Sequence, residues 1–479
     1  MNLLIEKLQA DQRKLSIICF SLFSGWLLTI PFEGQVLYTI ISNTQISGTI
    51  YNTIAVFAHF IGLFVSGFLI RRQISAKVTM ITSTIVCISG SLIFFLPFSI
   101  LWGISIISVS FFAGLFVASW GFYFKTYSEP DQRIKTAADV LIYSNIIMIF
   151  TNAVAINISP FIGLTITIIL LFGALITVFK LESVPIQDNS KKIYTDTQFS
   201  NICTILKPFI FLCLFILVIT INSGLMYQVV NPAFAHHELL VSFYWAVPYI
   251  LALVIIRNQT IRIDSAFLLY VALTMIGFSY ILFMLLDRSV VSYLIIDTLM
   301  LGAFGVCDLF WWSIIGALLD YVGNPAKILG IGLSMNVLGI LIGEIIATTV
   351  IPDINANYGG SILALIIIFS VIIMLPVLNA LLTKLLKKHA FLVKFANVEG
   401  NKQDKVLPDH RLYKQLTERE ISIVELLRKG YTYKAIAENL FISENTMKYH
   451  IKNIYQKLNV NSKMELIKMF VEDNKSKES

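Results

Sequence analysis

The chain has 479 residues, of which 57% are hydrophobic and 14% are charged. In soluble domains roughly a quarter of the residues are charged, so the composition excludes a single soluble globule. The net charge of +7 does not by itself indicate nucleic-acid binding, because membrane proteins collect Lys and Arg on their cytoplasmic loops.

Apolar stretches long enough to cross a bilayer follow a charged amino-terminal segment. A bilayer core of ~30 Å requires ~20 apolar residues as helix. Helix is the expected form, because lipid offers no partners to backbone polar groups. No small-residue cleavage site follows the first stretch, so we expect it to remain as a membrane helix. The twelve stretches lie near 15–31, 48–70, 78–98, 101–124, 135–156, 160–180, 208–230, 239–256, 264–286, 291–318, 328–351 and 361–386.

The cations of the connections alternate between the two sides of this predicted bundle. Every second connection is basic, whereas the other connections hold only Arg288. This asymmetry predicts that both termini are cytoplasmic, which requires an even number of spans. The basic connections carry Arg13, Lys14, Arg71, Arg72, Lys77, Lys125, Arg133, Lys135, Lys180, Lys191, Lys192, Lys207, Arg257, Arg262, Lys327, Lys384, Lys387 and Lys388.

The longest connection between spans, Leu181 to Lys207, divides the apolar part into six spans and six spans. This arrangement resembles the major facilitator superfamily over residues 1–386. That superfamily has a Gly-x-x-x-Asp-[Arg/Lys]-x-Gly loop after span two, where this chain has Gly67, Arg71 and Arg72 without the Asp or the second Gly. The departure argues against active transport.

Ionisable residues inside spans are costly and are treated as candidate functional sites. Asp297 and Asp308 lie eleven residues apart on span ten, about three turns, so they share a face with Phe304 and Trp311. We expect this face to bind a small ligand that is partly apolar or aromatic. His59 in span two and Glu344 in span eleven are further ligand-sensing candidates, although each could equally serve as a helix-to-helix hydrogen bond.

The composition changes after the last span. Residues 387–415 are polar and predict a cytoplasmic linker, and 416–479 predict a separate soluble domain of four helices. Thr417 and Glu420 have the spacing of a capping box, and Ser462 with Glu465 repeats it. The predicted architecture is therefore all-α: a polytopic membrane bundle followed by a small helical domain.

Within this domain a short helix ends near Leu440, and a tight turn leads to a longer helix from Glu444 to Leu458. That arrangement is typical of a helix-turn-helix. Its outer face is expected to carry Lys448, Tyr449, Lys452 and Lys457, which could reach bases in a major groove. A solvated cationic face, or a protein-binding module, remains the alternative.

The same segment resembles the LuxR-type, or GerE-type, DNA-binding domain. The resemblance rests on Leu416 to Glu420, Gly430, Ile436-Ala437, Leu440, Ile442-Ser443, Thr446, Lys448, His450, Asn453 to Tyr455, Lys457-Leu458 and Leu466. Ala435 departs from the family's usual Glu, and Met447 from its usual Val. The resemblance implies that Lys448, Tyr449 and Lys452 face base edges and that Ser443 and Thr446 approach phosphates. It also implies that the fourth helix forms a homodimer contact.

The whole chain is similar to bacterial LuxR-family regulators with a facilitator-like twelve-helix sensor. This implies a multi-pass protein of the bacterial inner membrane, with double-stranded DNA, the lipid bilayer and a small-molecule inducer as partners. Two other functions stay open: a facilitator-type transporter with an added regulatory domain, and a membrane-tethered DNA anchor without a ligand. No phosphate loop, nucleophile constellation, CxxC pair or metal-ligand cluster occurs, so no enzyme activity, catalytic residue, cofactor or metal is expected.

Overall fold

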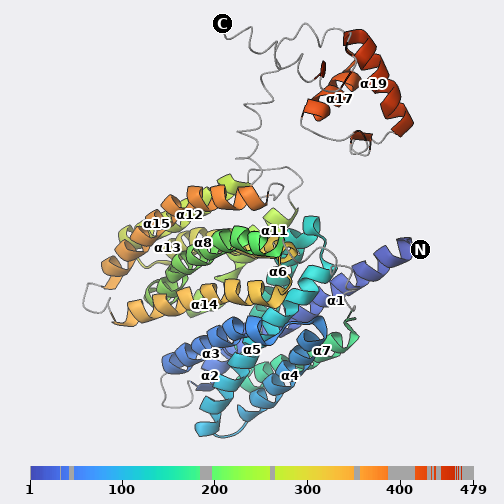
Figure 1. Ribbon diagram of the computed structural model, residues 1–479. Helices are drawn as coiled ribbons and strands as arrows, with labels where there is room; N and C mark the ends of the chain where they lie inside the picture. Colours follow the sequence, from blue (N-terminus) through green and yellow to red (C-terminus); the bar gives the residue numbers. More distant parts are fainter. Residues whose placement is uncertain are drawn as a thin grey trace. The chain divides into compact units, whose positions relative to one another are not determined.

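The computed structural model divides the chain into two compact units, Met1–Ala396 and Asn397–Ser479 (Figure 1). It describes residues 2–32, 34–41, 48–183, 197–258, 265–349, 356–386, 416–428, 433, 436–437, 444–458, 460, 462 and 465–466. Across these residues the regular structure is helical, without strands. We call the two units the membrane unit and the C-terminal unit.

Each predicted apolar stretch of the membrane unit coincides with helix. The first half comprises α1 (Asn2–Thr29), α2 (Gln35–Ile41), α3 (Gly48–Leu69), α4 (Gln73–Ile93), α5 (Ile100–Tyr127), α6 (Arg133–Asn157) and α7 (Pro160–Lys180). The second half comprises α8 (Thr197–Leu225), α9 (Asn231–Ala233), α10 (Glu238–Phe243), α11 (Ala246–Asn258), α12 (Ser265–Leu285), α13 (Val290–Leu318), α14 (Pro325–Thr349) and α15 (Ala356–Leu385).

Within the described residues, 11 helical segments are long and apolar enough to cross a membrane. The first of them begins at Tyr51, so α1 is additional to the 11. Most of the first predicted span, 15–31, lies in α1, which ends at Thr29 and also contains the charged residues Asp11, Arg13 and Lys14. The other eleven predicted spans correspond to the 11 apolar helical segments.

Three boundaries differ from the sequence prediction. Helix α8 begins at Thr197, well inside the segment expected to be a loop. Its outer end continues into a π-helical turn, Met226–Val230. The eighth predicted span is divided into α10 and α11. Such breaks leave the apolar pattern unchanged, so hydropathy alone does not locate them.

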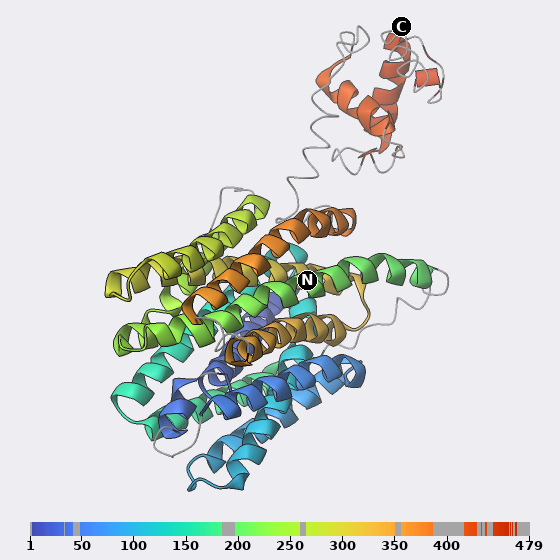
Figure 2. The ribbon, with the colours of Figure 1, turned by 90° about the vertical axis from the view of Figure 1, so that its left-hand side faces the viewer.

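The two halves repeat the same packing pattern. In the first half α5 packs against α3 and α4, and in the second half α13 packs against α11 and α12. Likewise α1 packs against α6 and α7, as α8 packs against α14 and α15. Figures 1 and 2 show the blue helices α3, α4 and α5 on one side of the membrane unit and the green and orange helices α8 and α15 on the other. The six-plus-six division predicted from the long connection is therefore also a structural repeat.

Helix α14 lies at the contact between the halves, where it packs on α3, α5 and α8. Small residues permit this close approach. A Cβ on Gly330 would lie 2.5 Å from the Leu63 carbonyl oxygen, and one on Gly343 would lie 2.3 Å from the Ile221 carbonyl oxygen. Movement of α14 would therefore be felt by both halves.

The C-terminal unit has its own hydrophobic core. Helices α17 (Glu418–Arg428) and α19 (Glu444–Leu458) pack around it. The buried members include Ile423, Val424, Leu427, Ile436, Ala437, Met447, Ile451, Ile454, Leu458 and Leu466. Ile421 and Leu426 of α17 pack against this core but are only partly buried. Most of the predicted second helix, the turn and most of the fourth helix lie outside the described residues.

Candidate nucleic-acid interface and ligand site

The predicted capping box at the start of α17 is present. The Thr417 amide donates to Glu420 Oε2 at 2.8 Å, and the Glu420 amide donates to Thr417 Oγ1 at 3.4 Å. The predicted repeat is also formed, since the Glu465 amide donates to Ser462 Oγ at 3.1 Å. These bonds satisfy helix amides that would otherwise lack partners.

Helix α19 presents one buried and one exposed face. Met447, Ile451 and Ile454 are buried in the core, whereas Tyr449 is 63% exposed and Thr446 and Lys452 are exposed. This amphipathic arrangement leaves a polar face available to a partner. Lys448 lies in α19, but its side chain and all of Ser443 fall outside the described residues.

Lys457 is exposed, but its side chain also contacts α17. Its ammonium group donates to Glu420 Oε2 at 2.7 Å. Burial opposes ionisation of Glu420, but the hydrogen bonds from Lys457 and Thr417 outweigh it and lower the pKa of that carboxyl group. Lys457 therefore joins α19 to α17.

In the membrane unit, the orientation of α13 follows from its aromatic contacts. The Trp312 ring lies 5.8 Å from Phe20 of α1 and 6.3 Å from Trp120 of α5, centroid to centroid. This face of α13 is therefore directed at the first half. Asp308 precedes Trp312 by one turn and lies on the same face.

Asp308 pairs with a tyrosine of the neighbouring helix. The Tyr249 hydroxyl donates to Asp308 Oδ2 at 2.6 Å. Asp308 is only half-buried, although its neighbours Cys307 and Leu309 are both fully buried. Asp308 is thus less enclosed than the residues on either side of it in α13.

The other predicted members of this face are more deeply buried. Phe304 and Asp297 are each 5% exposed, and Trp311 is 1% exposed. Asp297 Oδ2 and Trp311 Nε1 have no hydrogen-bond partner among the residues that the structure describes. Asp297 and Asp308 lie ~16 Å apart along the axis, so a small ligand could contact only one of the two carboxylates.

His59 and Glu344 lie apart from this face. His59 Nδ1 lies 3.1 Å from the Ser110 carbonyl oxygen of α5, and its ring packs edge-on to Phe32. Glu344 Oε1 accepts a hydrogen bond of 3.0 Å from Asn52, which links α14 to α3. For both residues the structure forms the helix-to-helix contact that the sequence left as an alternative.

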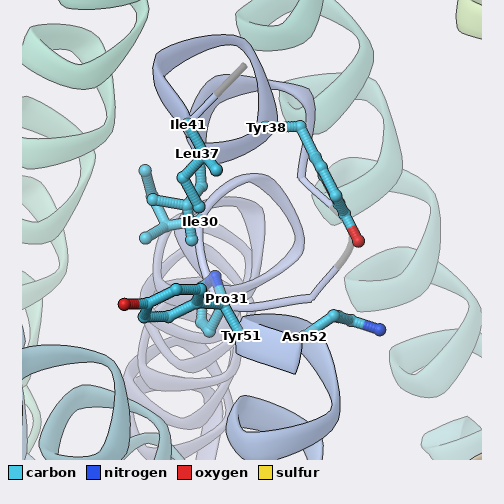
Figure 3. Close-up of a pocket in the computed structure, with 7 residues that line it drawn as sticks. All are labelled: Ile30, Pro31, Leu37, Tyr38, Ile41, Tyr51 and Asn52. Carbon is cyan, nitrogen blue, oxygen red and sulfur yellow. The ribbon is translucent and has the colours of Figure 1, made fainter. Parts of the chain in front are cut away.

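A pocket of about 220 Å³ lies beside Asn52. Figure 3 shows that it is formed where α1 ends, where α2 runs and where α3 begins. Its lining is Ile30, Pro31, Leu37, Tyr38, Ile41, Tyr51 and Asn52. Much of this volume is open to solvent, so the pocket has room for little more than a water molecule, far less than a site for a drug-sized molecule.

The sequence analysis missed a set of contacts at one end of the membrane unit. We call this end, which carries Lys77, Lys125, Arg133, Arg257 and Lys327, the basic end. There the Arg133 guanidinium donates to both carboxylate oxygens of Asp320, at 2.6 and 2.7 Å, and to the Gly316 carbonyl oxygen at 2.8 Å. The sequence analysis had used Arg133 only as evidence of orientation, because its partner is 187 positions away.

Further bonds join the two halves at the basic end. Lys125 donates to the Val322 carbonyl oxygen at 2.7 Å, and Arg257 forms an ion pair with Asp139. The Asn324 amide donates to the Gly67 carbonyl oxygen at 2.9 Å. Together with the aromatic contacts of Trp312, these bonds hold the halves together at this end.

Comparison with known proteins assigns the C-terminal unit to a family. Residues 414–470 match the family model described as bacterial regulatory proteins, luxR family. This part of the chain is a luxR-family helix-turn-helix domain. It is 43% identical over 60 residues to a nitrate/nitrite response regulator protein homolog of Haemophilus influenzae, covering 12% of this chain and 29% of that protein. It is 47% identical over 55 residues to the oxygen regulatory protein NreC of Staphylococcus carnosus, covering 12% and 25%.

The membrane unit is similar to solved transporters in fold. The human organic anion transporter MFSD10 (TETRAN) superposes with a TM-score of 0.59 at 12% identity, covering 78% of this chain and 99% of that one. A bacterial homologue of the iron transporter ferroportin gives 0.58 at 13% identity, with the same coverage. The chain therefore combines a major-facilitator-like membrane fold with a luxR-family DNA-binding domain.

Proposed function

We propose that this protein is a membrane-bound one-component transcription regulator. The C-terminal unit binds DNA, and the membrane unit senses a small molecule and alters that binding. The observation that carries the proposal is the presence of both folds in one chain. The luxR-family match spans about a quarter of its relatives, so only the DNA-binding part of their activity is transferred.

The orientation proposed for the chain is compatible with this function. DNA is accessible only from the cytoplasm, so the C-terminal unit must lie there. The basic end of the membrane unit is then the cytoplasmic end, as the distribution of Lys and Arg favours. The fourth predicted helix would supply a homodimer contact, which two DNA half-sites would require.

The contacts at the basic end suggest how sensing reaches the DNA-binding domain. A ligand shifts a two-state equilibrium only by its difference in affinity for the two states. Ligand binding between the halves would favour one arrangement of the basic end over another. Helix α15 ends at Leu385 in this unit, and the segment that leads to the luxR-family domain follows it.

A transporter is the second candidate, because the solved structures that share the fold include transporters. At 12–13% identity this similarity concerns the fold alone. The loop after α3 also lacks the superfamily's Asp, and its region is instead bonded to α14 through Gly67 and Asn324. These features favour a sensor over a cycling carrier.

Genome-wide DNA crosslinking of the tagged full-length protein tests the proposal. We expect a limited set of enriched promoter sites that the Lys452→Ala variant loses while remaining in the membrane. Transcription of the adjacent genes should respond to an inducer, and uptake of that inducer should not change when the gene is deleted. Enrichment equal to that of an unrelated membrane protein would reject the regulator. Loss of uptake on deletion, with normal transcription, would support the transporter.

A further inference from the structure

The ionisable residues inside the membrane unit are mainly acidic. In the described spans, Lys and Arg lie toward the span ends, whereas Asp297, Asp308 and Glu344 lie farther inside. Glu344 accepts a hydrogen bond from Asn52 and Asp308 accepts one from Tyr249. An ionised carboxylate in a low-dielectric interior is costly unless a cation or several hydrogen bonds stabilise it.

We propose that Asp308 is the centre of a site for a small organic cation with an aromatic or apolar body. The inference rests on the proposed sensing function and names the charge of the ligand. Tyr249 occupies Oδ2 of Asp308, and the other oxygen accepts no hydrogen bond from the part of the chain that the structure describes. That oxygen can bind an ammonium group.

The surroundings of Asp308 fit such a ligand. The contacts of Trp312 with Phe20 and Trp120 direct this face of α13 toward the first half, and Asp308, one turn before Trp312, is only half-buried. Side chains on a helix lean toward its amino terminus, so Trp311 leans toward the turn of Asp308. Its Nε1 is buried and lacks a partner among the described residues.

A second polar group, one turn from Asp308 on the same helix, thus has no hydrogen-bond partner among the described residues, as expected where a ligand supplies the partner. Phe304 and Trp311 provide aromatic rings on the same face, and aromatic ring faces attract cations. An anion is disfavoured, because the Asp308 carboxylate would repel it and the described Lys and Arg residues lie toward the ends of the spans. The charge of the carboxylate and the aromatic rings together select a cation over a neutral or anionic molecule of equal size; the indole N–H would instead bind an acceptor atom on the ligand.

The test uses two probes of similar size and opposite charge, phenyltrimethylammonium and benzenesulfonate. Binding to the purified full-length protein is measured by calorimetry and by the shift in its thermal unfolding. We expect phenyltrimethylammonium to bind and benzenesulfonate not to bind. The Asp308→Asn variant should bind the cation ~10-fold more weakly or worse, because the ligand's charge loses its buried partner. Asp287→Asn, in the loop before α13, is the control and should bind normally.

The Tyr249→Phe variant tests whether Asp308 binds the ligand or only stabilises the fold. This variant keeps the carboxylate, so it should keep the preference for the cation, even if it unfolds at a lower temperature. If Asp308 served only as the partner of Tyr249, both variants would lose stability alike and neither would change the preference. Binding of benzenesulfonate by the wild type, or of neither probe, overturns the cation site. Cation binding without any transcriptional response would uphold the site and reject the sensing function instead.

Discussion

The bond between Glu420 and Lys457 is a single-residue contact that joins both described helices of the C-terminal unit. We expect Glu420→Gln to lower the free energy of unfolding of this unit by about 1–2 kcal/mol, because it weakens a helix cap and removes the ion pair with Lys457. Chemical denaturation of the Asn397–Ser479 unit at neutral pH measures this difference. An unchanged unfolding midpoint would contradict the assigned role.

The same contact predicts a pH dependence. In the folded state the pKa of Glu420 lies below its ordinary value of 4.5. A lowered pKa gives stability that is fully present above the unfolded value and is lost as the pH falls through the folded value. The stability difference between wild type and Glu420→Gln should therefore be constant near neutral pH and shrink as the pH falls below about 4.5. A difference that grew on acidification would show that the sign is wrong.

Two lysines of α19 provide a matched test of DNA recognition. Lys452→Ala should weaken specific binding by about 1–3 kcal/mol if the side chain reaches bases. Lys457 is bonded to Glu420, so Lys457→Ala should lower stability while the folded protein keeps its affinity. Titration of operator DNA with the purified protein at fixed salt measures both. Equal losses of affinity for the two variants would mean that the recognition face has been misassigned.

At this scale the sequence predicted local contacts well and distant contacts poorly. The capping boxes depend on residues three positions apart, so their spacing is sufficient to predict them. The partner of Lys457 is 37 positions away, and a helical wheel does not show which neighbouring helix a long side chain meets. For the same reason the bond from Tyr249 to Asp308, 59 positions apart, could not be predicted, although the shared face of α13 could.

At the scale of whole elements, the close packing of α14 against α8 makes a direct prediction. A Cβ on Gly343 would meet the Ile221 carbonyl oxygen at 2.3 Å, so Gly343→Val must separate the two helices. We expect a loss of stability of about 1–3 kcal/mol, as is usual for overpacking. Gly323→Ala is the control, because a Cβ there meets nothing within 4 Å. Thermal unfolding of the detergent-solubilised protein should distinguish the variants, and equal midpoints would contradict the packing.

Helix positions were predictable because the bilayer imposes a length and an apolar composition on each span. Their interruptions were not, because the division between α10 and α11 and the π-helical turn after α8 both lie in sequence that is apolar enough to continue a span. The early start of α8 at Thr197 was missed because its first turns are polar and extend beyond the apolar stretch.

For the whole molecule, the decisive question is whether the basic end of the membrane unit can open. Arg133 is 3% exposed and is bonded to Asp320, to Gly316 and to Ser128. Removing the carboxylate leaves the buried guanidinium with carbonyl partners only. Because Asp320 itself is partly exposed, we expect Asp320→Asn to shift the balance between joined and separated halves by about 1–2 kcal/mol, a factor of ~5–30.

This shift can be measured as a distance. Spin labels on unnatural residues at Glu129 and Gly323 would report the separation of the loops that precede α6 and α14. Asp320→Asn should increase the population with the longer distance and should alter transcription without inducer. Asp287→Asn, in the loop before α13 at the opposite end, is the control and should change neither. If the loops separated but transcription stayed constant, opening of the basic end would not be the signal that reaches the DNA-binding domain.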